Sequence, residues 1–296
     1  MMKKLGILGV VIVFILSSAV AFAGESYTLG VLAKRGPVKA LKKWSATGDY
    51  LSSAIGQKFE IVPLSFDEVN PAIKAGKLDF FLVNSSMFVT AKVKYGAKAI
   101  ATMVNSRQGK ALKSFGGVIF TSVDNDAINT LADLKGQSFM GVKKSSFGGW
   151  QMAYSAFINA GIDPFADFSD LKFGNKHDNV VLAVQNGVVA AGTVRTDTLE
   201  RMAADETIYM EDFKIIKGEN SPEFPFVLST ALYPEWPLAK AKKTPEAIAN
   251  QVVAVLKNMT PGDAAAKSAK IVGWVDALDY TPVENLQKKL KIGAFK

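Results

Sequence analysis

The stretch MGVKKSSFGGWQMAYSAF, residues 140–157, decides the fold of this chain. It begins as the end of an apolar run, turns through lysine, serine and glycine, and then places Trp150, Tyr154 and Phe157 at helical spacing. Strand, polar turn and helix in this order form the unit from which parallel sheets are built. The Ser-Ser-x-Gly-Gly turn joins the strand to the helix, which raises the question of what it holds.

The same alternation runs along the whole chain. Strands are predicted for the apolar runs SYTLGVLA, KFEIVPL, LDFFLVN, SFMGV and VVAAGTV. Helices are predicted over residues 38–55, 69–75, 87–95, 150–159, 179–186 and 245–257. This order predicts an α/β fold with largely parallel sheets.

The two halves of the chain also resemble each other. The order strand, turn, helix, strand, helix, glycine, strand, polar triplet, helix occurs twice, and matching positions such as Gly30 and Gly141 lie 111 residues apart. Two similar open sheets predict two lobes, and in such sheets ligands bind beyond the carboxyl ends of the strands. We therefore expect four turns to converge on one cleft, at residues 33–37, 84–86, 143–149 and 195–197.

The chain must cross between these lobes twice. Residues 115–123 read as the outgoing strand and residues 221–232 as the return. The predicted segments are a first part of lobe 1 over 24–117, lobe 2 over 118–222, and a return with C-terminal helices that complete lobe 1 over 223–296.

Residues 1–23 have the composition of a signal peptide. MMKK is a positive start, LGILGVVIVFILSSAV is apolar, and AFA ends at Ala23 as a cleavage site. The alternative is an uncleaved membrane anchor, but the apolar run is short for a span and ends in that cleavage site. We expect export to the periplasm, cleavage after Ala23 and no membrane insertion of the mature chain.

The composition excludes several classes of function. Without Lys3 and Lys4 the formal charge falls from +8 to +6, and no basic block or Arg–aromatic pattern typical of nucleic-acid binders is present. The chain has no cysteine, so it has no disulfide and no thiolate metal site, and we expect no cofactor and no metal. The positive excess is either a solvated surface or a field that steers anions to a cleft.

The turns carry the chemistry of an anion site. Unpaired N–H groups at a helix start attract an anion, and small residues let it approach. Ser145 and Ser146 add hydroxyl groups and Gly148 removes side-chain bulk. The alternative for each serine is plain helix capping. Because four turns occupy equivalent places, we favour a shared anion site that also includes Asn84, Ser85 and Ser86.

Charged candidates flank these turns. Arg195 could fork onto two oxygens of a tetrahedral anion, with Thr196 beside it, or it could form a salt bridge with Asp197 or Glu200. Lys34 could add charge from the first lobe or lie in solvent.

His177 is the single histidine of the chain. It is either a neutral or protonated donor to an oxyanion or a solvated loop residue, and Asp178 is a candidate cap for the helix that follows. Ser145, His177 and Asp178 do not form a plausible triad, because adjacent residues do not normally orient one another as base and orienter. No G-x-S-x-G elbow and no His/Cys cluster with metal spacing is present, so we predict that the chain is not an enzyme.

LADLKGQSFMGVKKSSFGGWQMAYSAFINAGIDP (131–164) and KHDNVVLAVQNGVVAAGTVRTDTLE (176–200) resemble the phosphate/phosphite/phosphonate-binding family of periplasmic solute-binding proteins. YPEWPLAK and YTPVENLQKKLKIGAF, near the C-terminus, are similar to a branch that also forms the sensor region of histidine kinases, including tetrathionate-responsive ones. The resemblance implies a type II periplasmic binding fold, with two lobes joined by two crossing strands.

The resemblance also implies ligand contacts. Ser145, Ser146, Gly148 and His177 match positions where the family binds its oxyanion. The family often has Asp where this chain has Ala190, which we interpret as a structural change. Family members that bind aminoalkylphosphonates use acidic side chains for the amine. Arg195, Phe224 and Phe226 lie about where we would look for such acids, which disfavours an amine-bearing ligand.

The sequence thus predicts a monomeric periplasmic binding protein that captures a small oxyanion, such as a phosphonate, phosphite or phosphate, for an ABC permease. One alternative is a stand-alone sensory subunit that signals an oxyanion to a histidine kinase. An alternative of another class is a periplasmic hydrolase or transferase on the same fold.

Overall fold

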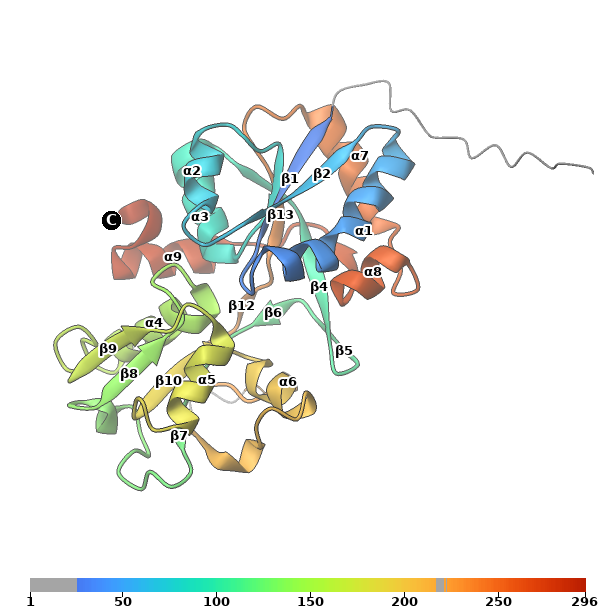
Figure 1. Ribbon diagram of the computed structural model, residues 1–296. Coiled ribbons are helices and arrows are strands. Elements are labelled where there is room, and N and C mark those ends of the chain that lie inside the picture. The colour runs from blue at the N-terminus through green and yellow to red at the C-terminus, as the bar shows by residue number, and fades with distance from the viewer. Residues whose placement is uncertain (1–25, 217–220, 222) are drawn as a thin grey trace, which may run out of the picture.

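The computed structural model describes residues 26–216, 221 and 223–296, and these form two lobes that meet at a waist (Figure 1). The predicted signal peptide lies outside the described residues. Each lobe has one sheet with helices packed on its faces. The prediction of a two-lobed α/β fold is confirmed.

The larger sheet belongs to the lobe that contains both ends of the described chain. Its order is β14-β4-β13-β3-β1-β2, and β5 is added to β4. The strands are β1 (Tyr27–Leu32), β2 (Phe59–Leu64), β3 (Phe80–Leu82), β4 (Lys98–Arg107), β5 (Lys110–Leu112), β13 (Pro237–Lys240) and β14 (Ile271–Val275). β1, β2 and β3 are parallel, because helices connect them, whereas β13 runs antiparallel to its neighbours.

The helices of this lobe are α1 (Pro37–Ile55), α2 (Val69–Lys74), α3 (Ser85–Tyr95), α7 (Glu246–Lys257), α8 (Ala264–Ala269) and α9 (Thr281–Leu290), with a short 3-10 turn at Gly293–Phe295. α1 begins with a proline, which suits the first helical position, and ends at Gly56 in the left-handed conformation. Its buried face, which includes Trp44 and Leu51, packs into the core of the lobe. The opposite face of α1 is therefore available to solvent and to the waist.

The smaller sheet has the order β11-β7-β10-β8-β9. Its strands are β7 (Gly117–Ser122), β8 (Ser138–Gly141), β9 (Asp170–Phe173), β10 (Ala191–Arg195) and β11 (Phe213–Ile216). Its helices are α4 (Met152–Asn159), α5 (His177–Gln185) and α6 (Thr198–Ala204), with 3-10 turns at Ala132–Leu134 and Met210–Asp212. A π-helical turn over Phe147–Gln151 leads directly into α4, so the helix predicted from Trp150 starts earlier and in a wider form.

The internal repeat is visible in the order of the strands. β2-β1-β3-β13 in one sheet corresponds to β9-β8-β10-β7 in the other, and in both the last strand is antiparallel to its neighbour. Gly76 and Gly187 close equivalent helices with φ values of 65° and 66°. Both glycines adopt the left-handed region, which other residues rarely occupy.

Two short strands connect the lobes. β6 (Ser114–Phe115) pairs with β12 (Tyr233–Pro234), antiparallel, at the waist (Figure 1). The return strand lies just after residues 221–232, where it was predicted. Within that stretch, side chains take the place of backbone strand pairing, since Ser229 Oγ and Thr230 Oγ1 accept the N–H groups of Ile119 and Gly117. Two chain crossings at one place make a hinge that allows the lobes to rotate.

Candidate ligand-binding cleft

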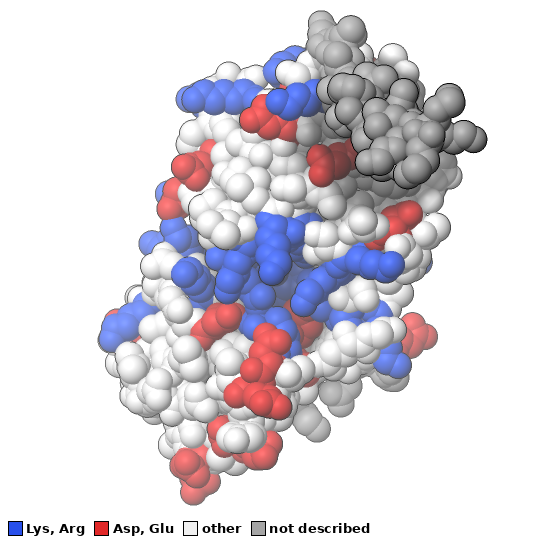
Figure 2. Space-filling model, turned by 45° about the vertical axis from the view of Figure 1, so that its right-hand side comes forward, with Lys and Arg blue, Asp and Glu red and all other residues white. Residues whose placement is uncertain are grey.

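A cleft of about 700 Å³ lies between the lobes. It opens at the turn after β1, beside α1, and at the turn after β10 on the other side. Figure 2 shows Lys and Arg side chains gathered across the middle of the molecule, between the two lobes. The location matches the expectation that ligands bind beyond the carboxyl ends of the strands.

The lining of the cleft is strongly cationic. Asp197 and Asp205 are its acidic residues, and the basic ones are Lys34, Arg35, Lys39, Lys42, Lys43, Arg107, Arg195, Arg201, Lys267 and Lys270. All four arginines form ion pairs, whereas within the described residues none of these six lysines does. The lysines therefore supply uncompensated positive charge, which favours an anionic ligand.

Lys34 is one of the partly buried lysines of the cleft. It follows β1, where Gly36 (φ 97°) turns the chain into α1, and its Nζ lies 5.3 Å from the centroid of the Trp236 ring. Burial, followed by the charge of Arg195, lowers the pKa of Lys34 from 10.5 to about 7. An anion in the cleft would reverse this shift, because it would stabilise the charged ammonium.

Lys43 has a second, separate environment. It lies on α1, and its Nζ is 4.9 Å from the ring centroid of Trp44. Burial, and then the nearby charge of Arg107, lowers the pKa of Lys43 well below 10.5. Two half-buried ammonium groups with lowered pKa values are typical of a site that is completed by an anion.

Arg195 is held by a buried ion pair. Its Nη1 lies 3.2 Å from Glu235 Oε2, its Nη2 contacts Oε1 of the same carboxylate, and its guanidinium carbon is 4.1 Å from the centroid of the Phe115 ring. Arg195 is 4% exposed and Glu235 0%. Asp197 contributes only a longer contact of 3.6 Å to Nε. The main partner is thus neither Asp197 nor Glu200, and a ligand contact by Arg195 stays a prediction.

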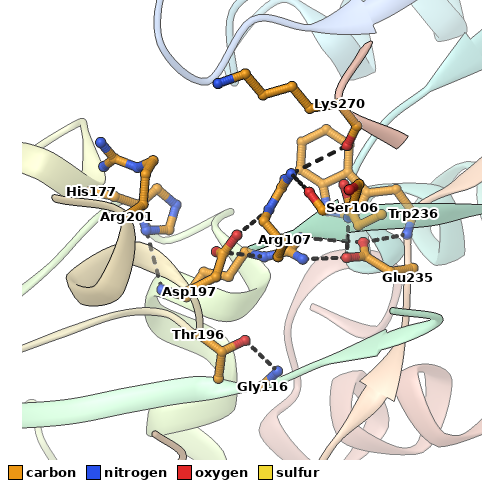
Figure 3. Close-up of polar contacts among 12 residues, drawn as sticks. Ser106, Arg107, Gly116, His177, Thr196, Asp197, Arg201, Glu235, Trp236 and Lys270 are labelled. Carbon is orange, nitrogen blue, oxygen red and sulfur yellow. Dashed lines mark hydrogen bonds and ion pairs between the residues drawn. The ribbon is translucent and has the colours of Figure 1, made fainter. Parts of the chain in front are cut away.

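A second arginine ties the lobes together. Figure 3 shows Arg107, on β4, between Asp197 of the smaller lobe and the carbonyl oxygens of Ser106 and Lys270. The Nε of Arg107 contacts the carboxylate of Asp197, and Nη1 donates to Ser106 O at 2.9 Å and to Lys270 O at 3.4 Å. Burial opposes ionisation, but Arg107 and Arg195 keep the pKa of Asp197 below its usual value. Both buried arginines therefore connect one lobe to the other.

His177 begins α5 and lines the cleft. Its Nδ1 accepts the backbone N–H of Arg195 at 3.2 Å (Figure 3). Burial, followed by the charge of Lys34, lowers its pKa well below 6.5. The imidazole is therefore neutral, and because Nδ1 is an acceptor the proton is on Nε2. Asp178 does not cap the helix: it pairs with Arg201 and, at 3.6 Å, with Arg35.

The serine turns lie elsewhere. Asn84, which caps α3, donates from Nδ2 to Ser145 O at 3.2 Å, so two of the predicted turns meet each other across the lobes. Ser85 Oγ donates to Pro234 O at 2.7 Å, and Ser86 Oγ accepts from Gln287 at 2.7 Å. None of these residues lines the cleft. Their ligand contacts, like that of Ser146, remain predictions.

Thr196 and Gly148 also have structural neighbours. Thr196 Oγ1 accepts the N–H of Gly116, at the start of the crossing to the smaller lobe, at 3.2 Å. A side chain on Gly148 would come within 2.9 Å of the Phe115 ring and 3.2 Å of Arg195 Cβ. The turn that opened the sequence analysis therefore packs directly behind Arg195, and its glycine is needed for that approach.

Replacing Gly149 by alanine is expected to destabilise the protein by about 1–3 kcal/mol, because the new methyl group overpacks the site. An added Cβ would lie 2.4 Å from Val142, 2.8 Å from Ser146 Oγ and 2.9 Å from His177 Cε1. Urea denaturation measures the loss. Gly262→Ala is the matched control, because its nearest neighbour, Thr260, is 3.6 Å away. Equal stability of the two variants would contradict this close packing.

Several cleft residues were not predicted from the sequence. Lys43, Arg107 and Trp236 line the cleft, and Glu235 is the buried partner of Arg195. A signal for the first existed, since Lys39 and Lys43 are four residues apart in a predicted helix and therefore lie on one face. Glu235 and Trp236 carry no local signal, because they reach the site from a distant part of the chain.

Within the described residues we also looked for a metal site and a membrane-spanning helix. No three of their His, Asp and Glu side chains are grouped as metal ligands. In the same part of the chain, no helix combines the length and the apolar character that a bilayer crossing requires.

Comparisons with known proteins agree with this fold. A family model described as "ABC transporter, phosphonate, periplasmic substrate-binding protein" matches residues 29–281. The fold is similar to that of a binding protein component of an ABC phosphonate transporter from Pseudomonas aeruginosa (TM-score 0.72, 15% identity, 88% of this chain and 85% of that one). It is also similar to PhnD1 from Prochlorococcus marinus in complex with methylphosphonate (TM-score 0.71, 15% identity, 90% and 98%).

A curated relative is a sensor rather than a transport protein. The tetrathionate sensor histidine kinase TtrS of Salmonella typhimurium is 30% identical over 273 residues, which are 92% of this chain and 44% of the kinase. The chain thus spans less than half of that relative. Since the family model covers most of the chain, the protein belongs to the periplasmic substrate-binding proteins of phosphonate ABC transporters.

Proposed function

We propose that this protein captures a small oxyanion in the cleft between its lobes and delivers it to an ABC permease. The observation that carries the proposal is the set of six unpaired lysines that line the cleft. Phosphonate, phosphite and phosphate share the required chemistry, since each presents several oxygens on one anionic centre. We further propose that the protein acts as a monomer in the periplasm, after removal of its leader at Ala23.

Three side chains have distinct roles in this proposal. Lys34 supplies positive charge. Its pKa lies at about 7 in the empty cleft, and a bound anion raises this pKa and so restores the full charge. His177 donates a hydrogen bond from Nε2 as a neutral imidazole, and this bond orients the anion. The backbone N–H of Arg195 donates to Nδ1 of His177 and fixes the orientation of the ring, so Arg195 supports the site indirectly. Asn84 and the turn at Ser145 already contact each other across the lobes, which rotate about β6 and β12.

A sensory role is the second candidate, and the likeness to the kinase favours it. The matched region covers 92% of this chain. In that role the closed protein would present itself to a histidine kinase instead of a permease, and tetrathionate would be the ligand to test. Titration with tetrathionate and with methylphosphonate in parallel shows which ligand is preferred, and tighter binding of tetrathionate would favour the sensory role.

An enzymatic role is disfavoured by the state of His177. Its Nδ1 is occupied by the Arg195 N–H, and its lowered pKa makes the imidazole a poor base. His177 is therefore not the base that a serine nucleophile would require. Steady release of phosphate from a phosphonate or phosphate ester would show an enzyme instead.

The proposal is tested by anion binding to purified protein. Native mass spectrometry shows whether an anion is retained, and calorimetry with methylphosphonate and phosphate gives the affinities. Lys34→Met is expected to weaken binding about 10–100-fold, since a charge-assisted hydrogen bond contributes about 1.5–3 kcal/mol. His177→Ala is expected to cost less, about 3–10-fold, because its donor is neutral.

Lys58→Met serves as the control, because Lys58 is exposed and does not line the cleft. It should bind like the original protein. If no oxyanion binds, or if Lys34→Met binds as tightly as Lys58→Met, the cleft is not the site.

A further inference from the structure

The cationic cleft also has an apolar part. Its large apolar lining residues are Leu32, Trp44, Met103, Phe226 and Trp236. All of them except Phe226 are members of the buried core of the larger lobe, so their position is fixed by packing. The cleft thus offers a ligand two kinds of surface, one cationic and one apolar.

Trp44, Met103 and Trp236 form a continuous surface, here called the apolar floor. The N–H of Met103 donates to Trp236 O at 3.2 Å, so these two residues are direct neighbours. Trp274 is the partner of Met103 in the pairing of β14 with β4, and cross-strand partners point to the same face of a sheet. The Trp274 ring lies 6.5 Å from that of Trp44. The apolar floor therefore runs from Trp236 across β4 to α1.

Lys34 lies at the edge of the apolar floor. Its Nζ is 5.3 Å from the centroid of the Trp236 ring. An anion oxygen bonded to this ammonium at about 2.8 Å lies within about 8 Å of the same centroid. A substituent of a few atoms on the anion is therefore long enough to reach the apolar floor.

Phe226 lines the same cleft from the smaller lobe. Its neighbour Val227 donates its N–H to Glu200 Oε1 of α6 at 2.9 Å, which ties this segment to the smaller lobe. The Phe226 ring is half-buried and lies 6.0 Å from the ring of Phe224. Apolar side chains of both lobes therefore border one cavity.

An anion without carbon would use only the cationic part of this cavity. Phosphate or phosphite pairs with the lysines but leaves the apolar floor and Phe226 in contact with water. An apolar substituent on the anion displaces that water, and the burial of apolar surface is favourable. The cavity of about 700 Å³ has room for such a substituent, since pockets for organic ligands have about 300–1,000 Å³.

We propose that the natural ligand is an organic oxyanion with one acidic group and a bulky apolar substituent, such as a ring. The acidic group pairs with Lys34, and the substituent packs between the apolar floor and Phe226. The inference rests on the proposed function and narrows its ligand class. It favours organic phosphonates over phosphate, phosphite and tetrathionate, because none of these three carries an apolar substituent.

The test compares three phosphonates that differ only in their substituent. Calorimetry at pH 6, where Lys34 is charged, gives the affinities. Phenylphosphonate should bind at least tenfold more tightly than methylphosphonate, because its ring covers the apolar floor. 2-Hydroxyethylphosphonate, with a polar substituent, should gain less than threefold. Phenylphosphonate should also show the most negative heat capacity change of binding, which marks the burial of apolar surface.

Phe226→Ser tests the contact from the smaller lobe. The ratio of the phenylphosphonate affinity to the methylphosphonate affinity should fall at least threefold in this variant. Taking the ratio cancels any effect that is common to both ligands. Phe165→Ser is the matched control, because Phe165 is an exposed phenylalanine that does not line the cleft. It should keep the full ratio.

Three results would overturn the inference and leave the proposed function standing. Phenylphosphonate could bind no more tightly than methylphosphonate, 2-hydroxyethylphosphonate could gain as much, or Phe226→Ser and Phe165→Ser could have the same ratio. The comparison of the three phosphonates in the original protein decides the inference even if Phe226→Ser does not fold. If neither phosphate nor any of the phosphonates binds, the proposed function itself is overturned.

Discussion

Glu235→Gln is expected to lower the free energy of unfolding by about 3–5 kcal/mol, because it leaves the Arg195 guanidinium buried without a counter-charge. Glu235 is fully buried, and its carboxylate also accepts the N–H of Trp236 at 3.0 Å and a hydrogen bond from Asn105. Arg195→Met should cost a similar amount, since it leaves the carboxylate unpaired. Urea denaturation of both variants measures the losses.

The double variant makes the experiment decisive. When both charges are removed, neither partner is left unpaired, so the combined loss should be clearly smaller than the sum of the single losses. Asp276→Asn is the control, because Asp276 forms an exposed pair with Lys257 and its removal should leave the midpoint unchanged. If Arg195→Met instead spares stability and abolishes anion binding, Arg195 is a ligand contact as the sequence suggested.

The affinity for methylphosphonate is expected to fall as the pH rises above about 7, by up to about tenfold per pH unit, because of Lys34. In the empty protein its ammonium loses a proton near pH 7, whereas a bound anion raises its pKa. Binding therefore takes up a proton above pH 7 and becomes weaker as protons become scarce. Calorimetry in buffers of different ionisation enthalpy measures this uptake directly.

Lys34→Met provides the control for this slope, since the titration of the ligand cancels in the ratio of the two affinities. The ratio should be constant below pH 6 and fall above pH 7. His177 should contribute no step near pH 6.5, because its pKa is well below that value. A ratio that does not change between pH 6 and 9 would show that Lys34 does not touch the anion.

The parts of the fold that could be predicted from the sequence are those with local or periodic signals. α1, for example, was expected over 38–55 and spans Pro37–Ile55, because its proline, its apolar face and its closing glycine are all adjacent in sequence. The repeat of 111 residues predicted the shared order of β1, β2 and β3 with β8, β9 and β10 for the same reason.

The site was harder to predict because its contacts join distant residues. For Arg195 the sequence offered Asp197 and Glu200 as partners, but its carboxylate comes from Glu235, forty residues away and across the hinge. The two serine turns were expected to share an anion, yet Asn84 reaches Ser145 directly. Chain order gives no measure of how closely two lobes approach each other.

The two buried arginines, Arg195 and Arg107, affect how a partner protein distinguishes the ligand-bound from the ligand-free molecule. Arg195–Glu235 and Arg107–Asp197 pull the lobes together whether or not a ligand is present. The six cleft lysines that form no ion pair within the described residues all belong to the larger lobe, whereas Arg195 and Arg201 of the smaller lobe already have carboxylate partners. The arginine pairs therefore set how far the empty protein is already closed, and a bound anion adds only its own contacts between the lysines and the smaller lobe. A permease or kinase that recognises the closed form would then receive a background signal set by the strength of the arginine pairs.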